Sequence, residues 1–457
     1  MEQYKKWFIQ DEEKLLREFE TFIAFETISS DKTKYKEMEK CVAWLCQQIE
    51  PLGFSVEKWE AKDAPPVLYA SYIKEDSPTL LLYNHYDVQP VDPLDEWESD
   101  PFSLTKKGNK LYGRGASDNK GQCFYLLCAL RYYYKQHGTF PCSIKWIIEG
   151  EEEVASHALQ HFLQEKEIES DYVLLLDSGM REKNVPAISL GVRGIVPLDI
   201  IVEGTNQDLH SGLHGGVAYN PLHALVTLLS SLRDEKGVVQ VPHFYDKVKK
   251  VSDEEKKKCA LFFDEEKYKE EFGAEPSGGE HQFSPIERLW FRPTIEINGI
   301  SGGYEGEGCK TVIPHKASAK LSCRLVPDQN PIECAAYVKY YLENQAPKGI
   351  SVEVSIGVGY GYPLRVDPNS HLIHALEKGC KKVLGKQPEL IYDAGSIPIA
   401  AELQKKSGGE LAFFGLALPG DRIHAPNEHF SMDRIEKGML LLIELLQHFS
   451  FQEKDTY

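Results

Sequence analysis

The chain of 457 residues is longer than the size at which a single hydrophobic core usually stops growing, so its length predicts two domains. Hydrophobic residues make up 42% of the sequence, which is enough for a large core. The 70 acidic residues outnumber the 52 basic ones, and the formal net charge of −18 argues against nucleic acid or an anionic membrane surface as a partner.

No segment of the sequence has the pattern of a secretion signal or a membrane anchor. The first residues, MEQYKKWFIQDEEKLL, lack the apolar core and the small-residue cleavage site of a signal, and no later stretch approaches the length of a membrane span. These patterns predict a cytoplasmic protein. The ten cysteines contain no C-x-x-C pair, so we expect neither a zinc knuckle nor a disulfide framework, but ten buried, reduced thiols.

The first part of the chain alternates helical and extended patterns. Apolar residues at helical spacing predict amphipathic helices around residues 15–23 and 38–49. Further along, apolar runs alternate with helical segments, which is typical of an α/β sheet that is at least partly parallel. Strands are expected at 66–73, 79–88, 143–153 and 172–178, and helices at 121–138 and 157–167.

The pattern changes near residue 191 and changes back after Pro363. The intervening segments indicate a separate α+β domain, with a helix that starts at Asn220 and β-rich stretches at 187–204, 295–300, 316–327 and 351–359. Its charged stretch at 247–271 gives no functional signal. The first pattern then resumes with helices at 371–384 and 434–449 and a strand at 410–418. The simplest architecture is one α/β domain, residues 1–190 and 361–457, interrupted by an inserted domain, residues 191–360.

Residues with metal-binding chemistry follow the ends of several predicted strands. His85 and Asp87 stand two positions apart, so an extended chain places both side chains on the same face. A histidine beside a carboxylate is the usual composition of a metal ligand and the group that orients it. By itself, a surface turn is the simpler explanation of this H-x-D pattern.

Asp118 lies between a glycine-rich turn and a predicted helix, in LYGRGASDNKG. A helix N-cap is one explanation of this position. The turn lacks the G-x-x-x-x-G-K-[ST] spacing of a phosphate loop, so we do not expect nucleotide binding.

The strand SIKWIIE runs directly into a cluster of carboxylates, Glu149 and Glu151 to Glu153. Burying adjacent carboxylates without a cation is costly, so the cluster indicates either an exposed acidic loop or a metal site. Asp177 ends another strand, and His424 lies in the loop after a fourth. Because open α/β sheets place their active sites at these strand ends, the two histidines and the carboxylates predict two zinc ions that share a bridging carboxylate.

These residues and their surroundings resemble the di-zinc peptidase family that includes carnosine dipeptidase, cytosolic non-specific dipeptidase, aminoacylase, acetylornithine deacetylase and the glutamate carboxypeptidases. The resemblance covers nearly the whole chain in order. It is strongest to the dipeptidase branch, on the motifs NHYDVQP, LYGRGASDNKG, DLHSGLHGG, GYEGEGCKTVIP and RLVP. It implies a catalytic domain with a central mixed sheet flanked by helices, and an inserted α+β domain that serves for dimerisation and as a lid.

The resemblance also implies the metal ligands. His85 and Asp177 correspond to the ligands of one zinc, Glu153 and His424 to those of the other, and Asp118 to the carboxylate that bridges them.

By the same resemblance, Asp87 orients His85, and Glu152 is the general base that takes a proton from the attacking water and passes it to the leaving amine. The family pattern Glu-Gly-x-Glu-Glu-x-Gly-Ser aligns with EGEEEVAS, where Ala155 replaces the second glycine. This alignment selects Glu152 as the base and Glu153 as the ligand. A shift by one residue, to Glu151 and Glu152, stays open.

In the inserted domain, the resemblance implies that His210 of DLHSGLHGG reaches the active site of a partner subunit and stabilises the oxyanion. The catalytic unit would then be a homodimer. Arg324 of SCRLVP corresponds to the residue that binds the substrate's free carboxylate, a task that suits a planar guanidinium; a strand-surface arginine is the alternative. Thr311 and Ser396 correspond to positions that contact the substrate.

The expected function is therefore hydrolysis of dipeptides or short peptides by an enzyme with two zinc ions per subunit, or with manganese or cobalt in their place. The nearest alternative is a deacylase of the same fold that cleaves N-acyl amino acids. A non-catalytic metal-binding assembly protein is a further alternative, although no ligand or base is missing.

Overall fold

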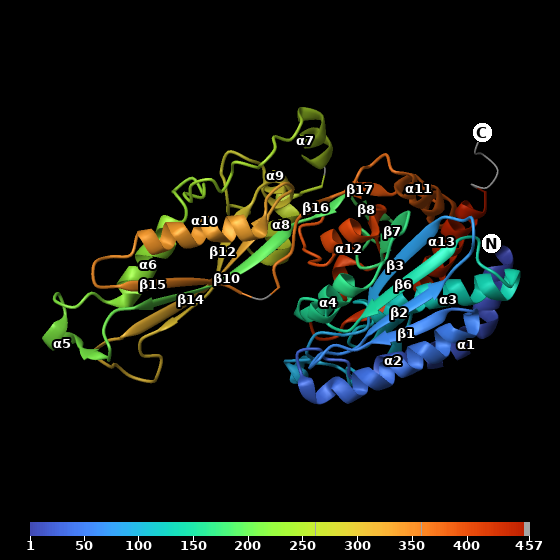
Figure 1. Cartoon of the computed structure of the whole chain (residues 1–457), viewed down its shortest axis with the longest axis horizontal. Helices are drawn as coiled ribbons and strands as arrows, with labels where there is room; N and C mark the ends of the chain where they lie inside the picture. The colour runs from blue at the N-terminus through green and yellow to red at the C-terminus, as the bar shows by residue number, and fades with distance from the viewer. Residues whose placement is uncertain (261, 358, 452–457) are drawn as a thin grey trace. The chain divides into compact units, whose positions relative to one another are not determined.

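The computed structural model describes residues 1–260, 262–357 and 359–451. The chain folds into two compact units (Figure 1). The larger unit comprises Met1–Leu190, Val366–Ile391 and Ile399–Tyr457, and the inserted unit comprises Gly191–Arg365 and Tyr392–Pro398. The inserted unit therefore interrupts the larger one twice, whereas the sequence pattern assigns residues 392–398 to the larger domain.

An eight-stranded mixed sheet forms the centre of the larger unit, in the order β1-β2-β6-β3-β7-β18-β8-β17. Strands β6, β3, β7 and β18 run parallel, and so do β8 and β17. The pairs β1–β2, β2–β6 and β8–β18 are antiparallel. This sheet confirms the predicted α/β fold. The strands are β1 (Ser55–Trp59), β2 (Val67–Tyr72), β3 (Thr79–His85), β6 (Ser143–Glu149), β7 (Tyr172–Leu175), β8 (Ala187–Ser189), β17 (Glu389–Ile391) and β18 (Glu410–Phe414).

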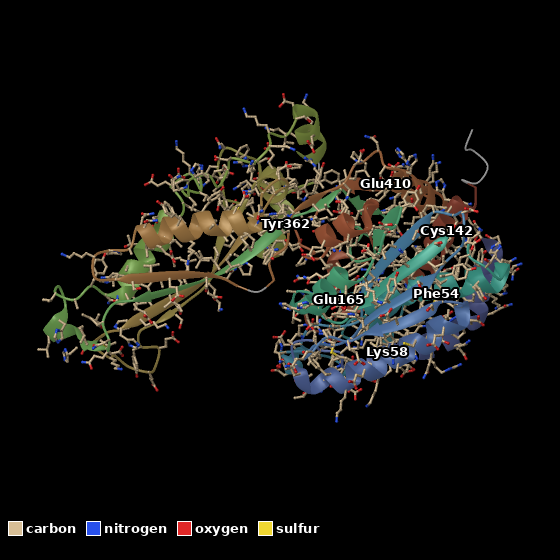
Figure 2. All side chains as sticks on the ribbon, viewed as in Figure 1. Phe54, Lys58, Cys142, Glu165, Tyr362 and Glu410 are labelled. Carbon is tan, nitrogen blue, oxygen red and sulfur yellow. The ribbon has the colours of Figure 1, made fainter. Side chains whose placement is uncertain are left out.

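Helices cover the sheet, and its inner strands β3 and β6 are therefore buried along almost their whole length. Helix α3 packs on α1, α13 and β3, α11 packs on α13 and β18, and α4 packs with α12 and β2. The outer strand β1 instead exposes the charged Glu57 and Lys58, which protect the sheet edge. Figure 2 labels Lys58 on this strand. The helices are α1 (Glu2–Ala24), α2 (Tyr35–Ile49), α3 (Lys120–His137), α4 (His157–Glu165), α11 (His371–Leu384), α12 (Ala400–Ser407) and α13 (Met432–Phe451).

Two expectations for the larger unit and its connections are corrected. The strand expected at 143–153 ends at Glu149, and the carboxylates that follow form a short 3-10 turn, Glu152–Val154. The β-rich stretch at 187–204 is divided into β8 of the larger unit and two strands of the inserted unit, β9 (Gly191–Val192) and β10 (Gly194–Glu203). Glycines at 191 and 194 mark the division, and a side chain at Gly191 would meet the carbonyl of Leu364 at 2.4 Å.

The inserted unit has a four-stranded antiparallel sheet, in the order β12-β14-β10-β15. Alternate residues of β10 are buried beneath α6 and α10. Asn220 and Asn330 cap these helices by accepting backbone N–H groups. This arrangement is the α+β fold predicted for the insert. Its elements include α6 (Pro221–Ser231), α10 (Pro331–Asn344), β12 (Thr294–Gly302), β14 (Lys316–Leu325) and β15 (Ser351–Ile356).

The charged stretch belongs to a second, small core of the inserted unit. Helices α7 (Asp253–Ala260) and α9 (Pro285–Phe291) supply its buried residues, and α8 (Glu265–Phe272) lies between them in the chain. Cys259, Ile286 and Phe291 form its buried centre, and Trp290 and Tyr392 pack against them. Tyr392 begins the returning segment Tyr392–Pro398, so this core anchors that segment.

Short strands complete the chain. The larger unit contains β4 (Thr105–Lys107), β5 (Lys110–Tyr112) and β19 (His429–Ser431), and the inserted unit contains β11 (Leu209–His210), β13 (Val312–Ile313) and β16 (Leu364–Arg365). The inserted unit also contains the four-residue helix α5 (Ser211–His214). Among the described residues, no helix combines the length and the apolar character that a membrane span requires.

All ten cysteines are free, and nine of them are buried. The prediction that all ten are buried is wrong for Cys309, which is exposed. The loop that carries it is rich in glycine and acidic residues and has too few apolar side chains to bury it.

Candidate metal centre

The parallel strands bring the predicted ligands of the larger unit to one edge of the sheet. His85 is the last residue of β3 and lies opposite Glu149, the last residue of β6. Asp177 follows β7 by two positions, and His424 lies in the loop between β18 and β19. Because parallel strands end at the same edge, side chains far apart in the sequence meet there.

Five side chains form two groups that share one carboxylate. In the first, His85 Nε2 lies 3.1 Å from Asp118 Oδ1 and 3.7 Å from Asp177 Oδ1. In the second, His424 Nε2 lies 3.0 Å from Asp118 Oδ2 and 3.2 Å from Glu153 Oε2. The candidate ligand atoms in each group all lie within 4.8 Å of one another. Asp118 therefore turns one oxygen toward each group, as a bridging carboxylate does.

Asp118 does not act as a helix N-cap. The N-cap of α3 is Asn119, and no side chain caps this helix. Burial alone would raise the pKa of Asp118, but its hydrogen bonds with His424 and His85 lower it. The geometry thus favours the metal interpretation of Asp118 over the capping interpretation.

The electrostatics of the centre fit bound cations. Burial raises the pKa of Glu153, and the negative charge of Asp118 raises it further. Glu153 Oε1 is buried and has no hydrogen-bond partner among the described residues. Hydrogen bonds to Asp118 and Glu153 raise the pKa of His424 to about 10. The negative charge of the carboxylates thus favours cations beside His424. Two divalent ions would supply that positive charge and take up the free oxygen, and nitrogen and oxygen donors without sulfur suit zinc or manganese.

Asp87 connects the two groups of ligands. Its carboxylate lies 3.3 Å from His85 Nδ1 and accepts the backbone N–H groups of Glu152 and Glu153 at 3.3 and 3.1 Å. A proton on Nδ1 of His85 leaves Nε2 free to face Asp118 and Asp177. These contacts suit the predicted orienting role of Asp87.

The four carboxylates at the end of β6 and just after it have different partners. Glu149 accepts hydrogen bonds from Tyr83 and Ser156, and burial raises its pKa to about 8. Glu151 Oε2 accepts the backbone N–H of Ala158, near the start of α4.

Glu152 and Glu153 instead lie at the centre. Burial first, and then the charges of Asp177, Glu153 and Asp118, raise the pKa of Glu152 well above its usual value. Glu153 Oε2 accepts from Gln89 and faces His424. This division favours Glu152 as the base and Glu153 as the ligand over the shift to Glu151 and Glu152.

Sequence reasoning missed several residues that hold the ligands in place. Asn119 donates to Asp177 Oδ1 at 2.9 Å and accepts from Asn84 at 2.6 Å. Gln89 donates to Glu153, and Glu428 accepts the backbone N–H of Asp118. Each of these residues is polar and lies within four positions of a predicted ligand in the chain. That proximity is the only sequence signal they carry.

The remaining predicted site residues belong to the inserted unit. Arg324 on β14 donates from Nη1 to Ser396 Oγ at 2.9 Å, and burial lowers its pKa. His210 is exposed at the end of β11, where its Nδ1 accepts the N–H of Gly212 at 3.0 Å. Thr311 is also exposed, and its carbonyl accepts from the residue after His210. The fold therefore pairs Arg324 with Ser396, and His210 with Thr311.

Comparisons with known proteins agree with this geometry. Residues 81–448 match the model of the peptidase family M20/M25/M40. The chain is 34% identical to Beta-Ala-His dipeptidase of Homo sapiens over 376 residues, which cover 80% of this chain and 73% of that protein. It is 27% identical to Cys-Gly metallodipeptidase dug1 of Schizosaccharomyces pombe over 443 residues, which cover 92% of each chain.

A solved structure is similar over almost its whole length. The M20 family metallo-carboxypeptidase Sso-CP2 from Sulfolobus solfataricus superimposes with a TM-score of 0.85 at 31% identity. The alignment covers 95% of this chain and 99% of that one. The resemblance inferred from the motifs is thereby confirmed at the level of the family and of the fold.

Proposed function

The chain belongs to the peptidase family M20/M25/M40, and from this premise we propose that it is a metal-dependent dipeptidase that hydrolyses dipeptides or short peptides with a free C-terminal carboxylate. The observation that carries the proposal is the pair of ligand groups that share Asp118, with Glu152 beside them. The similar proteins named above act on Beta-Ala-His and Cys-Gly, which favours dipeptides over N-acyl amino acids as substrates.

Five residues would hold two zinc ions, or manganese or cobalt ions in their place. His85 and Asp177 would hold one ion, Glu153 and His424 the other, and Asp118 both. When bound, the ions supply Lewis-acid chemistry, which polarises the scissile carbonyl and lowers the pKa of water toward neutrality.

Glu152 is the proposed general base. It accepts a proton from the attacking water and later donates that proton to the leaving amine. In the metal-free chain, burial is the main cause that raises the pKa of Glu152. The negative charges of Asp177, Glu153 and Asp118 raise it further. The Asp87 carboxylate accepts a hydrogen bond from the backbone N–H of Glu152 and thereby keeps the base beside the ligands.

Arg324 is the proposed site for the substrate's C-terminal carboxylate. Arg324 is half-buried, and its guanidinium donates a hydrogen bond to Ser396. Among the described residues it forms no ion pair with a carboxylate of the protein, so its charge is free for a ligand. Ser396 and Thr311 supply hydroxyl groups for further contacts with the peptide.

His210 is the proposed donor to the oxyanion in a homodimer formed through the inserted unit. Because its Nδ1 accepts a backbone N–H, the proton of a neutral imidazole lies on Nε2, where it is available to a negatively charged oxygen. Exposed apolar residues near it, Leu213, Val217 and Tyr219, support an interface in this region.

We further propose that the protein acts in the cytoplasm. All ten cysteines are free, which is the usual state in a reducing compartment.

A substrate panel tests the proposed function. Free dipeptides are expected to be hydrolysed in the presence of zinc, manganese or cobalt. The kcat/KM of their C-terminal amides should be roughly 10-fold to 100-fold lower, because a charge-assisted hydrogen bond contributes about 1.5–3 kcal/mol. Arg324→Ala should raise KM for the free dipeptides and remove most of this preference. Faster cleavage of N-acetyl or N-succinyl amino acids than of dipeptides would instead identify a deacylase.

Complementation between subunits tests the role of His210. Chains carrying Glu152→Ala and His210→Ala can be co-expressed with different tags and purified as a heterodimer. If His210 crosses to the partner subunit, this heterodimer contains one intact site and should recover about half of the wild-type activity, because the two sites of a twofold dimer are equivalent. A heterodimer as inactive as both parental dimers would refute the crossing.

A further inference from the structure

Glu428 is a buried carboxylate to which the proposed reaction gives no role. Its side chain is 1% exposed. Both of its oxygens accept hydrogen bonds from the glycine-rich turn before α3. Oε2 accepts from Gly115 N at 2.8 Å and from Arg114 Nη1 at 3.0 Å, and Oε1 accepts from Ser117 N at 2.9 Å and Asp118 N at 3.0 Å.

The backbone of Glu428 also holds this turn. Its carbonyl accepts the N–H of Gly113 at 3.0 Å, next to the antiparallel pairing of β19 with β5. The turn needs such support because its path is tight. Gly115 has a φ of +82°, and a side chain there would meet Val88 at 2.5 Å. One glutamate therefore organises the backbone from residue 113 to residue 118.

The position of Glu428 also connects two metal ligands. His424 lies four residues before it in the same loop, and Asp118 is the last residue of the turn that it binds. A shift of this turn would move the Asp118 oxygens, which lie 3.1 Å from His85 and 3.0 Å from His424. The two groups of ligands share only Asp118, so such a shift would disturb both.

We propose that Glu428 is a positioning residue, which fixes the backbone of Asp118 so that one carboxylate oxygen faces each ligand group. The inference rests on the proposed function in one respect, namely that the two groups bind metal ions. Arg114, which is also 1% exposed, pairs with Glu428 and offsets the cost of burying its charge. A hydrophobic residue could fill the same space, but it could not accept four hydrogen bonds.

Metal-binding calorimetry on the metal-free chain provides the test. Glu428→Gln keeps the shape of the side chain but replaces one oxygen with an NH2 group, which cannot accept hydrogen bonds. Glu428→Asp keeps the charge but withdraws both oxygens from the turn. Both variants are expected to bind zinc or manganese about 10–100-fold more weakly than the wild type, the usual effect of removing a group that holds a metal ligand.

Ser117→Ala is the matched control. It removes a buried hydrogen bond of the same turn, from Ser117 Oγ to Asp421 at 2.8 Å, but leaves the contacts of Glu428 intact. Its metal affinity should stay within about twofold of the wild type, which is about fivefold or more below the 10–100-fold effect expected for Glu428. Circular dichroism at the calorimetry temperature establishes that each variant is folded.

Each outcome decides the proposal. Weaker metal binding in both Glu428 variants and not in Ser117→Ala supports it. Unchanged affinity in a folded Glu428 variant overturns it, and so does equal weakening in Ser117→Ala, since the turn as a whole would then be responsible. Failure of both Glu428 variants to fold also overturns it, because Glu428 would then serve the fold. If the wild-type chain binds no metal, the proposed function itself fails.

Discussion

Replacing Glu152 with alanine is expected to lower kcat by about 10²–10⁴-fold, the usual contribution of a general base. The variant should still bind two metal ions, because the two ligand groups consist of His85, Asp118, Asp177, Glu153 and His424 and do not include Glu152. Loss of activity with unchanged metal content separates a base from a ligand. Turnover of a dipeptide and metal content after dialysis are the two measurements.

Glu151→Ala is the control for this experiment. The Glu151 side chain accepts the N–H of Ala158 and is directed toward α4, so its loss should lower stability by about 1 kcal/mol and leave kcat nearly unchanged. Full activity in Glu152→Ala would reject Glu152 as the base. If Glu151→Ala were the inactive variant and Glu152→Ala had lost metal, the alternative alignment would be correct.

The strand ends of the larger unit could be predicted because each combines an apolar run with a polar terminus. The runs before His85, Glu149 and Asp177 are long enough to identify as strands, and parallel strands bring their ends together. His424 was harder to derive from the residues alone, because it lies ten positions after the end of β18. The family resemblance supplied its role, and the structure places it beside Asp118.

The roles of the four glutamates could not be assigned from their local chemistry, and the family alignment selected Glu152 and Glu153 but left a shift by one residue open. Three consecutive carboxylates have the same local chemistry, and only the three-dimensional partners distinguish them. Glu151 accepts from the start of α4, whereas Glu153 meets His424. The distinction depends on the left-handed backbone at Ala155 and Ser156, which turns the chain into α4.

Long-range contacts account for the other omissions. Glu428 lies 310 positions from Asp118 in the chain, and no periodicity connects the two. The segment Tyr392–Pro398 was assigned to the wrong part of the fold, because seven residues are too few to carry a pattern. Its anchor, Tyr392, packs against Trp290 and Phe291 and donates a hydrogen bond to Glu255 of the charged stretch, so neither segment was interpretable without the other.

Asp118→Asn is expected to abolish measurable hydrolysis and to weaken both metal sites at once. Asparagine has the same shape but offers one uncharged oxygen in place of two that share a negative charge. In the wild type those oxygens lie 3.1 Å from His85 and 3.0 Å from His424, one in each ligand group. A variant that can face only one group with a neutral oxygen should retain fewer than two ions after dialysis.

Thermal unfolding gives an independent measure of the same loss, since an ion at 100 times its Kd stabilises the folded chain by about 2.7 kcal/mol. The wild type should therefore show a clear rise in Tm on addition of metal, and Asp118→Asn should show little. His424→Ala is the matched comparison, because His424 belongs to only one group, and this variant should retain the ion held by His85 and Asp177. If Asp118→Asn retained two ions at wild-type affinity, Asp118 would not bridge the two sites. If Asp118→Asn and His424→Ala lost the same number of metal ions, the two sites would not share Asp118.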